Sequence, residues 1–135
     1  MKFFFGLVSL LAFASTSYGW SQDVHCVDAS RYTTYRIHFS ELDLPTAKAK
    51  VTVEQGDQAT TWLLEGLFYM SYDMDLKKEF NGFVINFDPN DYTEKKTIRT
   101  HFFNHESEGH ILVKNADITG FDKVVKVPCT QKENL

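Results

Sequence analysis

The chain of 135 residues carries 14 Lys and Arg against 18 Asp and Glu, and 43% of its residues are hydrophobic. A chain of this length supports one hydrophobic core, and its apolar fraction exceeds that of disordered segments. Polynucleotide binding usually requires a basic stripe, whereas the balance here is acidic. We therefore expect a single folded domain with no nucleic-acid partner.

Residues 1–19 have the pattern of a cleaved secretion signal. Lys2 gives a positive start, an apolar run follows, and small residues precede a cleavage position after Gly19. An apolar run of about 12 residues is too short to span a bilayer, which needs roughly 20. We expect an exported protein, periplasmic or extracellular, without a transmembrane segment once the signal is removed.

The two cysteines lie near opposite ends of the expected domain, residues 20–135. In an oxidising compartment, such a pair most simply forms one disulfide. We therefore predict that Cys26 and Cys129 join the first strand of the domain to the last. Residues 130–135, which follow the second cysteine, have the composition of a frayed polar tail.

Most of the domain alternates between apolar and polar residues with a period of two. Residues 32–39 and 48–54 each place apolar side chains on one face and polar side chains on the other, as half-buried strands do. Residues 55–58 are typical of a turn. The following run, 61–70, is apolar at both parities, which predicts a strand covered on both faces, with a short helix as the alternative that fits the same pattern.

Asn81 and Gly82 predict a two-residue hairpin turn, because both residue types accept positive φ values. A strand is then expected over residues 83–87, and the last strand over residues 123–129. Short strands recur about every ten residues, with no long segment of helical period. The predicted fold class is all-β: a small antiparallel β-sandwich or barrel of about eight strands.

A hairpin over residues 97–115 carries three histidines. With a loop at residues 106–109, the predicted cross-strand pairs are His105 with His110, Phe103 with Leu112, and His101 with Lys114. The core face of this hairpin is expected to contain Ile98, Phe102, Ile111 and Val113. Its outer face then combines imidazole and apolar side chains, which is typical of a contact surface. We predict a binding site there, made of His101, Phe103, His105, His110 and Leu112.

The same loop offers a metal-binding alternative. Cross-strand Cβ atoms lie about 4.5 to 5.5 Å apart, so His105 and His110 could bind Zn²⁺ or Cu²⁺ together with Glu106 or Glu108. Two facing imidazoles would also respond to acid, because they repel when both are protonated near pH 6. Two imidazoles and a carboxylate fall short of a closed tetrahedral set, so we expect no metal or other cofactor.

Standard catalytic motifs are absent from the sequence. It contains no G-x-S-x-G, H-E-x-x-H, G-x-G-x-x-G or phosphate-binding loop motif. The remaining enzyme hypothesis is a small secreted hydrolase in which His38 and Glu65 perform acid and base chemistry with a histidine of the 97–115 hairpin. The signal, the disulfide and the missing motifs instead favour a non-enzymatic binding module for a protein or an envelope component. Size and architecture alone suggest an inhibitor or effector.

Overall fold

The computed structural model describes residues 20–87, 96–103, 106–116 and 122–134, so the predicted signal at residues 1–19 lies outside the described residues. The described residues form eight strands and one short 3-10 helix, η1 (Ala29–Arg31). The strands are β2 (Ser21–Asp28), β3 (Thr33–Asp43), β4 (Thr46–Gln55), β5 (Gln58–Asp73), β6 (Lys78–Asn86), β7 (Lys96–Phe103), β8 (Glu108–Ala116) and β9 (Asp122–Asn134).

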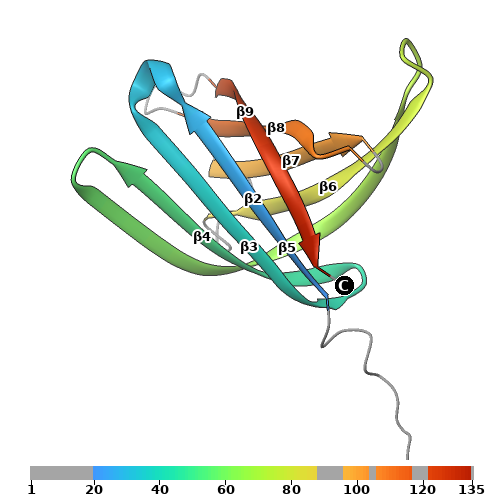
Figure 1. The fold of residues 1–135 in the computed structure, drawn as a ribbon, viewed down its shortest axis with the longest axis horizontal. Coiled ribbons are helices and arrows are strands. Elements are labelled where there is room, and N and C mark those ends of the chain that lie inside the picture. The colour runs from blue at the N-terminus through green and yellow to red at the C-terminus, as the bar shows by residue number, and fades with distance from the viewer. Residues whose placement is uncertain (1–19, 88–95, 104–105, 117–121, 135) are drawn as a thin grey trace, which may run out of the picture.

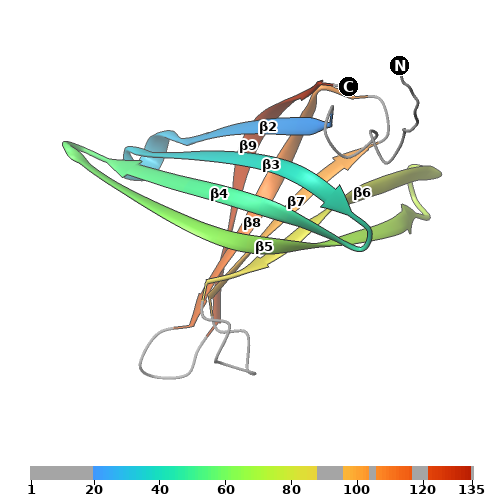
Figure 2. The same cartoon turned by 90° about the horizontal axis from the view of Figure 1, so that it is seen from below.

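The strands follow one another around a closed barrel in their order along the chain. Every strand is antiparallel to both neighbours, and β9 returns to pair with β2. Figure 1 and Figure 2 show this up-and-down arrangement from two directions. The all-β prediction is therefore confirmed, and the fold is the barrel rather than the sandwich. Closure pairs both long edges of every described strand, and so removes the free edges through which sheets aggregate.

Alternate residues of each strand point into the barrel and form its core. At the centre, the buried ring of Phe39 on β3 stacks on that of Phe83 on β6, with ring centroids 4.3 Å apart. Large buried side chains elsewhere in the core are Ile37, Ile85, Ile98, Phe102 and Ile111. The last three confirm the core face predicted for the 97–115 hairpin, and its fourth member, Val113, packs against the core.

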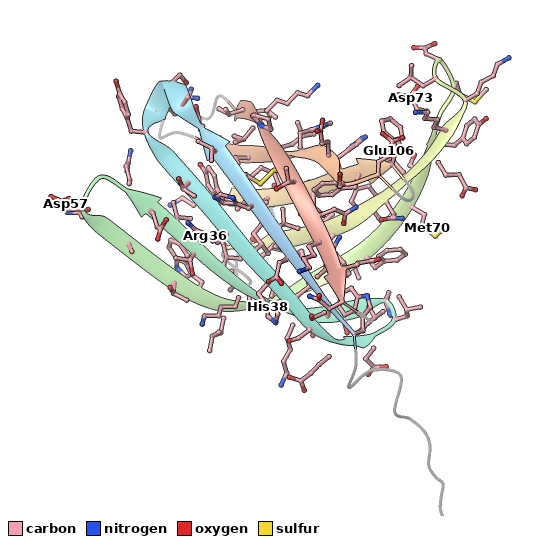
Figure 3. The ribbon with its side chains drawn as sticks, in the orientation of Figure 1. Arg36, His38, Asp57, Met70, Asp73 and Glu106 are labelled. Atoms are coloured by element: carbon pink, nitrogen blue, oxygen red, sulfur yellow. A yellow bond between two sulfur atoms is a disulfide. The ribbon has the colours of Figure 1, made fainter. Side chains whose placement is uncertain are left out.

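The predicted disulfide between Cys26 and Cys129 is present. The two residues face each other across the pairing of β2 with β9, and both are buried. The yellow bond in Figure 3 marks this link, which closes the barrel where its first and last described strands meet. Residues 130–134, which we expected to form a polar tail, instead continue β9. They are ordered because the first half of β2 pairs with them, and the Gln22 and Gln131 side chains also hydrogen-bond there.

Glycines at two positions show which turn predictions hold. The turn predicted at residues 55–58 is confirmed, with Gly56 at a φ of +62° between β4 and β5. The turn predicted at Asn81 and Gly82 is wrong, because both residues lie inside β6. A Cβ atom at Gly82 would lie 1.9 Å from the carbonyl oxygen of Thr100. Glycine is therefore required there by the close approach of β7, not by a turn.

The chain turns between β5 and β6 at residues 74–77. The carboxylate of Asp73 accepts hydrogen bonds from the backbone N–H groups of Asp75 and Leu76, each at 3.0 Å. A carboxylate that accepts hydrogen bonds from backbone N–H groups stabilises a turn. Such a turn does not need positive φ values at two successive residues, as the turn predicted at Asn81 and Gly82 would.

Strand β5, with 16 residues, is the longest described strand and contains the run 61–70, which is therefore a strand and not a short helix. The prediction that both faces of this run are covered is wrong. Leu63 on the outer face is 81% exposed, and Leu67 on the same face is also exposed. A closed barrel has a single layer, so its wall is buried on the inner side only.

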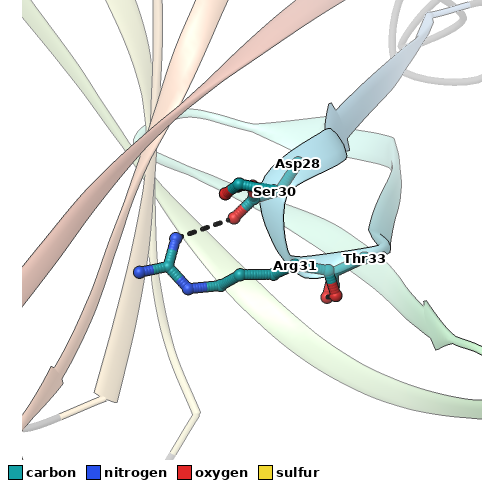
Figure 4. Close-up of polar contacts among 4 residues, drawn as sticks. All are labelled: Asp28, Ser30, Arg31 and Thr33. Carbon is teal, nitrogen blue, oxygen red and sulfur yellow. Dashed lines mark hydrogen bonds and ion pairs between the residues drawn. The ribbon is translucent and has the colours of Figure 1, made fainter.

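A polar corner joins β2 to β3 through η1 (Figure 4). The carboxylate of Asp28 accepts hydrogen bonds from Ser30 Oγ at 2.7 Å and from Arg31 Nη1 at 3.0 Å. Thr33 Oγ1 donates to the carbonyl oxygen of Arg31 at 3.0 Å. The hydrogen bond from Ser30, followed by that from Arg31, lowers the pKa of the Asp28 carboxyl group. The corner is therefore held by a charge-assisted network that favours the ionised carboxylate.

Candidate binding surface

Three rings stack in a column on the outer face of β6, β7 and β8. Phe80 stacks on His101 with ring centroids 3.8 Å apart, and His101 stacks on His110 with centroids 4.5 Å apart. The two histidines are direct cross-strand partners on β7 and β8. We call Phe80, His101 and His110 the ring column. It brings together side chains from three strands that alternation alone does not place in contact.

A surface hollow of about 460 Å³ lies beside the ring column. His101 and His110 line it together with Phe103 at the end of β7. Two carboxylates, Glu106 and Glu108, lie on one side, and β9 contributes Lys126 and Pro128. The hollow thus combines apolar walls, imidazole nitrogens and charges of both signs, which is the mixture that binding sites use to fix a ligand's orientation.

Phe103 is held in this hollow by rings and by a cation. Its ring lies edge-on to those of Phe80 and His101, with centroids 6.1 and 5.9 Å away. The ammonium of Lys78 lies 5.4 Å from the Phe103 ring centre and 3.0 Å from Glu106 Oε2. The β5–β6 hairpin is thereby tied to the loop between β7 and β8.

The surroundings of the ring column disfavour protonated imidazole. Burial, followed by the charges of His101 and Lys126, lowers the pKa of His110 to about 4. Burial and Lys126 also lower the pKa of His101, with Arg99 adding to the effect and Asp73 opposing it. Both rings are therefore neutral at pH 7, and each offers one donor and one acceptor nitrogen.

The predicted register of the 97–115 hairpin is wrong. His110 lies opposite His101 instead of His105, and Leu112 lies opposite Arg99 instead of Phe103. Lys114 likewise pairs with Thr97 and not with His101. The cause is that β8 begins at Glu108, so part of the predicted loop is strand. The shift is an even number of residues, so side chains keep their predicted faces.

Three of the five predicted binding residues are brought together in the hollow, namely His101, Phe103 and His110. Leu112 is half-buried on the same outer face, one step further along β8, and does not line the hollow. His105 lies outside the described residues.

The metal alternative stays a prediction, because His105 lies outside the described residues. The histidine that does face His110, His101, is not oriented to share a metal ion with it. A metal ion lies close to the plane of each imidazole that binds it, whereas the rings of His101 and His110 are stacked with an interplanar angle of 19°. They would have to turn apart to bind one ion. Glu106 and Glu108 line the same hollow, but within the described ranges no group of three or more potential ligands is placed to hold a metal.

The two residues of the hydrolase alternative lie elsewhere on the barrel wall. His38 and Glu65 line one hollow of about 570 Å³ over β3, β4 and β5, with Lys48 and Lys50 between them. The Nδ1 atom of His38 lies 2.7 Å from Asp23 Oδ1, and both side chains are exposed. Glu65 also points outward.

The β5–β6 hairpin extends past the ends of β7, β8 and β9 (Figure 1). Its far end, which we call the hairpin tip, exposes Met70, Tyr72, Met74 and Leu76, and Met74 is 77% exposed. Figure 3 labels Met70 and Asp73 on this hairpin. Large apolar side chains on a projecting and internally hydrogen-bonded turn are typical of contact surfaces.

The outer faces of β2, β3 and β4 have a different character. Apart from Val27, they carry mainly polar and charged side chains, including Asp23, His25, Arg36, His38, Lys48, Lys50 and Glu54. Figure 3 shows Arg36 and His38 on this side, away from the hairpin tip. Most of the exposed large apolar side chains among the described residues therefore lie on β5, the turn after it and β9, while Val27, Tyr32 and Leu44 lie elsewhere.

Sequence reasoning missed four contributors to this surface. Phe80 directly precedes the turn predicted at Asn81 and Gly82, so it was not expected within a strand. The hairpin tip was not recognised because Ser71, Asp73 and Asp75 separate its apolar residues. Lys126 and Pro128 alternate with the buried residues of β9, so their outward direction could have been deduced. Their proximity to His110 could not, because it depends on the register of β8 with β9.

Comparison of the chain with protein-family models, curated proteins and solved structures gives no match. Among the described residues, no helix is long and apolar enough to cross a membrane. The protein is thus defined by its fold, an eight-stranded up-and-down β-barrel, and by the surface on its outer wall.

Proposed function

We propose that this chain is an exported, non-enzymatic binding module that recognises a protein or an envelope component, in the manner of an inhibitor or effector. Its contact surface comprises the ring column, the hollow beside it and the hairpin tip. The observation that carries the proposal is the concentration of aromatic, neutral imidazole and exposed apolar groups on one side of the barrel. Fold alone would not support it, since barrels serve many functions.

The chemistry of this surface suits a partner with both apolar and hydrogen-bonding groups. Exposed Met74 and partly buried Phe103 supply the apolar anchors that dominate binding energy at interfaces. Neutral His101 and His110 are less costly to desolvate than charged groups, and can still donate and accept hydrogen bonds. Glu106 forms part of a charged rim that would govern orientation and specificity.

Export is supported by two independent features. Residues 1–19 have a signal-like sequence, and the disulfide between Cys26 and Cys129 belongs to an oxidising compartment. A periplasmic or extracellular partner follows from this location.

The proposal is tested by quantitative capture from the envelope and extracellular fractions of the source cells. The exported form of the protein is immobilised beside a Phe103→Ala/His110→Ala variant and a control, His25→Ala/Lys50→Ala, which alters the polar wall. All three are first compared by urea unfolding. We expect the wild type and the control to retain the same partner, and the Phe103/His110 variant to retain it at least about tenfold more weakly.

Two results would contradict the proposal. If the two variants retained the partner equally, the ring column would not be part of the contact surface. Absence of any component enriched by the wild type over uncoated matrix would overturn the binding module, and a hydrolytic activity lost in His38→Ala or Glu65→Ala would then favour catalysis.

A further inference from the structure

The ring column is surrounded by charges from every neighbouring strand. Arg99 on β7 and Lys126 on β9 act against protonation of His101, and Asp73 at the end of β5 acts for it. On β6, Lys78 is paired with Glu106 of the loop between β7 and β8. The remaining carboxylate, Glu108 at the start of β8, lines the hollow. Each imidazole also faces the other.

Protonation of both imidazoles would place two positive charges in a stack whose third ring, Phe80, carries no negative charge. The His101 and His110 ring centroids are 4.5 Å apart, so two positive charges on these rings would repel across the stack. Lys126 adds a third positive charge on the β9 side. On the other side, His101 rests on the ring of Phe80, which offers no counter-charge. Separation of the two rings toward solvent would relieve this repulsion.

We propose that the ring column is an acid-operated release device: with both imidazoles neutral it presents the contact surface, and protonation separates the rings and frees the partner. This inference concerns regulation and rests on the proposed function for its second half. Its first half, the opening of the column, belongs to the free protein and is measured without a partner.

The direction of the pH effect follows from linkage. In the unfolded chain, the two histidines bind protons near their ordinary pKa of 6.5, whereas folding lowers the pKa of His110 to about 4. Between these values, the unfolded state holds more protons than the folded state. The contribution of the ring column to stability is therefore complete above pH 6.5 and falls as the pH drops toward 4.

The first experiment follows the free protein from pH 7.5 to pH 3 by NMR and by urea unfolding, so that the range extends below the expected midpoint. We expect the Cε1 proton of His110 to titrate with a midpoint near pH 4 and the ring-current shifts of His101 and Phe80 to disappear in step. The urea midpoint should fall across this range in the wild type and in His25→Gln, whose histidine is exposed on β2. It should change much less in His101→Gln/His110→Gln.

The proposed opening of the column would be overturned if the ring-current shifts persisted after His110 is protonated. It would also be overturned if His110 titrated near the ordinary value of pH 6.5. The NMR titration uses the wild type, so it decides this point even if the double variant fails to fold.

The second experiment applies a step from pH 7 to pH 3 to the partner captured by the wild type. The lower pH is about one unit below the pKa of about 4 for His110. We expect at least about tenfold weaker retention at the lower pH, with the same loss for His25→Gln. Unchanged retention, with the column shown to open, would overturn acid release while leaving the binding module intact. Failure to capture any partner at pH 7 would overturn the proposed function and release with it, but not the opening measured by NMR.

Discussion

At Gly82, β6 lies so close to β7 that a Cβ atom would overlap the carbonyl oxygen of Thr100. Tyr69 on β5 is the cross-strand partner of Gly82. Its hydroxyl donates a hydrogen bond to the carbonyl oxygen of Thr100 at 2.6 Å. The side-chain oxygen of Thr100 accepts a hydrogen bond from the backbone N–H of Phe83 at 2.8 Å. A tyrosine opposite a glycine therefore spans the gap that the missing side chain leaves, and burial raises the pKa of the Tyr69 hydroxyl.

Gly82→Ala should destabilise the protein by about 3 kcal/mol, because its Cβ would overlap the Thr100 carbonyl and force the strands apart. Gly56→Ala is the matched comparison, since that glycine has open space around it and a positive φ only. It should cost about 1 kcal/mol. Urea unfolding measures both, and equal losses would show that β6 and β7 can separate freely.

The β5–β6 hairpin is the element that combines local order with an exposed apolar surface. Asp73 organises its turn through two backbone hydrogen bonds, and Lys78 anchors its return strand to Glu106. Met74 and Leu76 are thus displayed on an ordered turn. Such pre-organisation reduces the conformational entropy that binding would otherwise cost.

Asp73→Ala should loosen the hairpin tip while leaving the barrel nearly intact. We expect amide protection at Asp75 and Leu76 to fall at least about tenfold, and the free energy of global unfolding to change by about 1 kcal/mol or less. Hydrogen exchange followed by NMR measures both quantities. Asp75→Ala, which removes a neighbouring carboxylate that caps no described backbone group, should keep the protection; a similar loss there would refute the role of Asp73.

At the scale of the whole molecule, stability depends on closing the barrel between β2 and β9. The disulfide at that seam links residues 103 positions apart, so almost the entire domain lies within the loop that it closes. A cross-link over a loop of this length mainly restricts the unfolded chain. The same strands also pair from Ser21 to Cys26, which aligns the two cysteines.

Cys26→Ala/Cys129→Ala should lower the free energy of unfolding by about 2 to 5 kcal/mol. Wild-type protein reduced with a thiol should show the same decrease, which separates loss of the bond from the change of side chain. Urea unfolding followed by circular dichroism provides the measurement. If oxidised and reduced wild type unfold at the same urea concentration, the seam is held by strand pairing alone.

Local patterns in the sequence predicted several features correctly. The period of two in residues 33–39 identified the inward face of β3, and the same alternation placed His101, Phe103 and His110 on one outer face. The positions of the two cysteines predicted the disulfide. These features succeed because side-chain direction along a strand is a property of neighbouring residues.

The tertiary structure alone decided which of these side chains meet. The register of β7 with β8 pairs His110 with His101 and not with His105. The turn at Asp73 leaves Phe80 within β6. The pairing of β8 with β9 places Lys126 beside the two histidines. The position of a turn depends on which of several possible local hydrogen bonds form. The register of a strand pair depends on pairing along the whole length of both strands. Sequence alternation therefore determined the faces of this barrel, whereas long-range pairing determined which side chains meet on its outer surface.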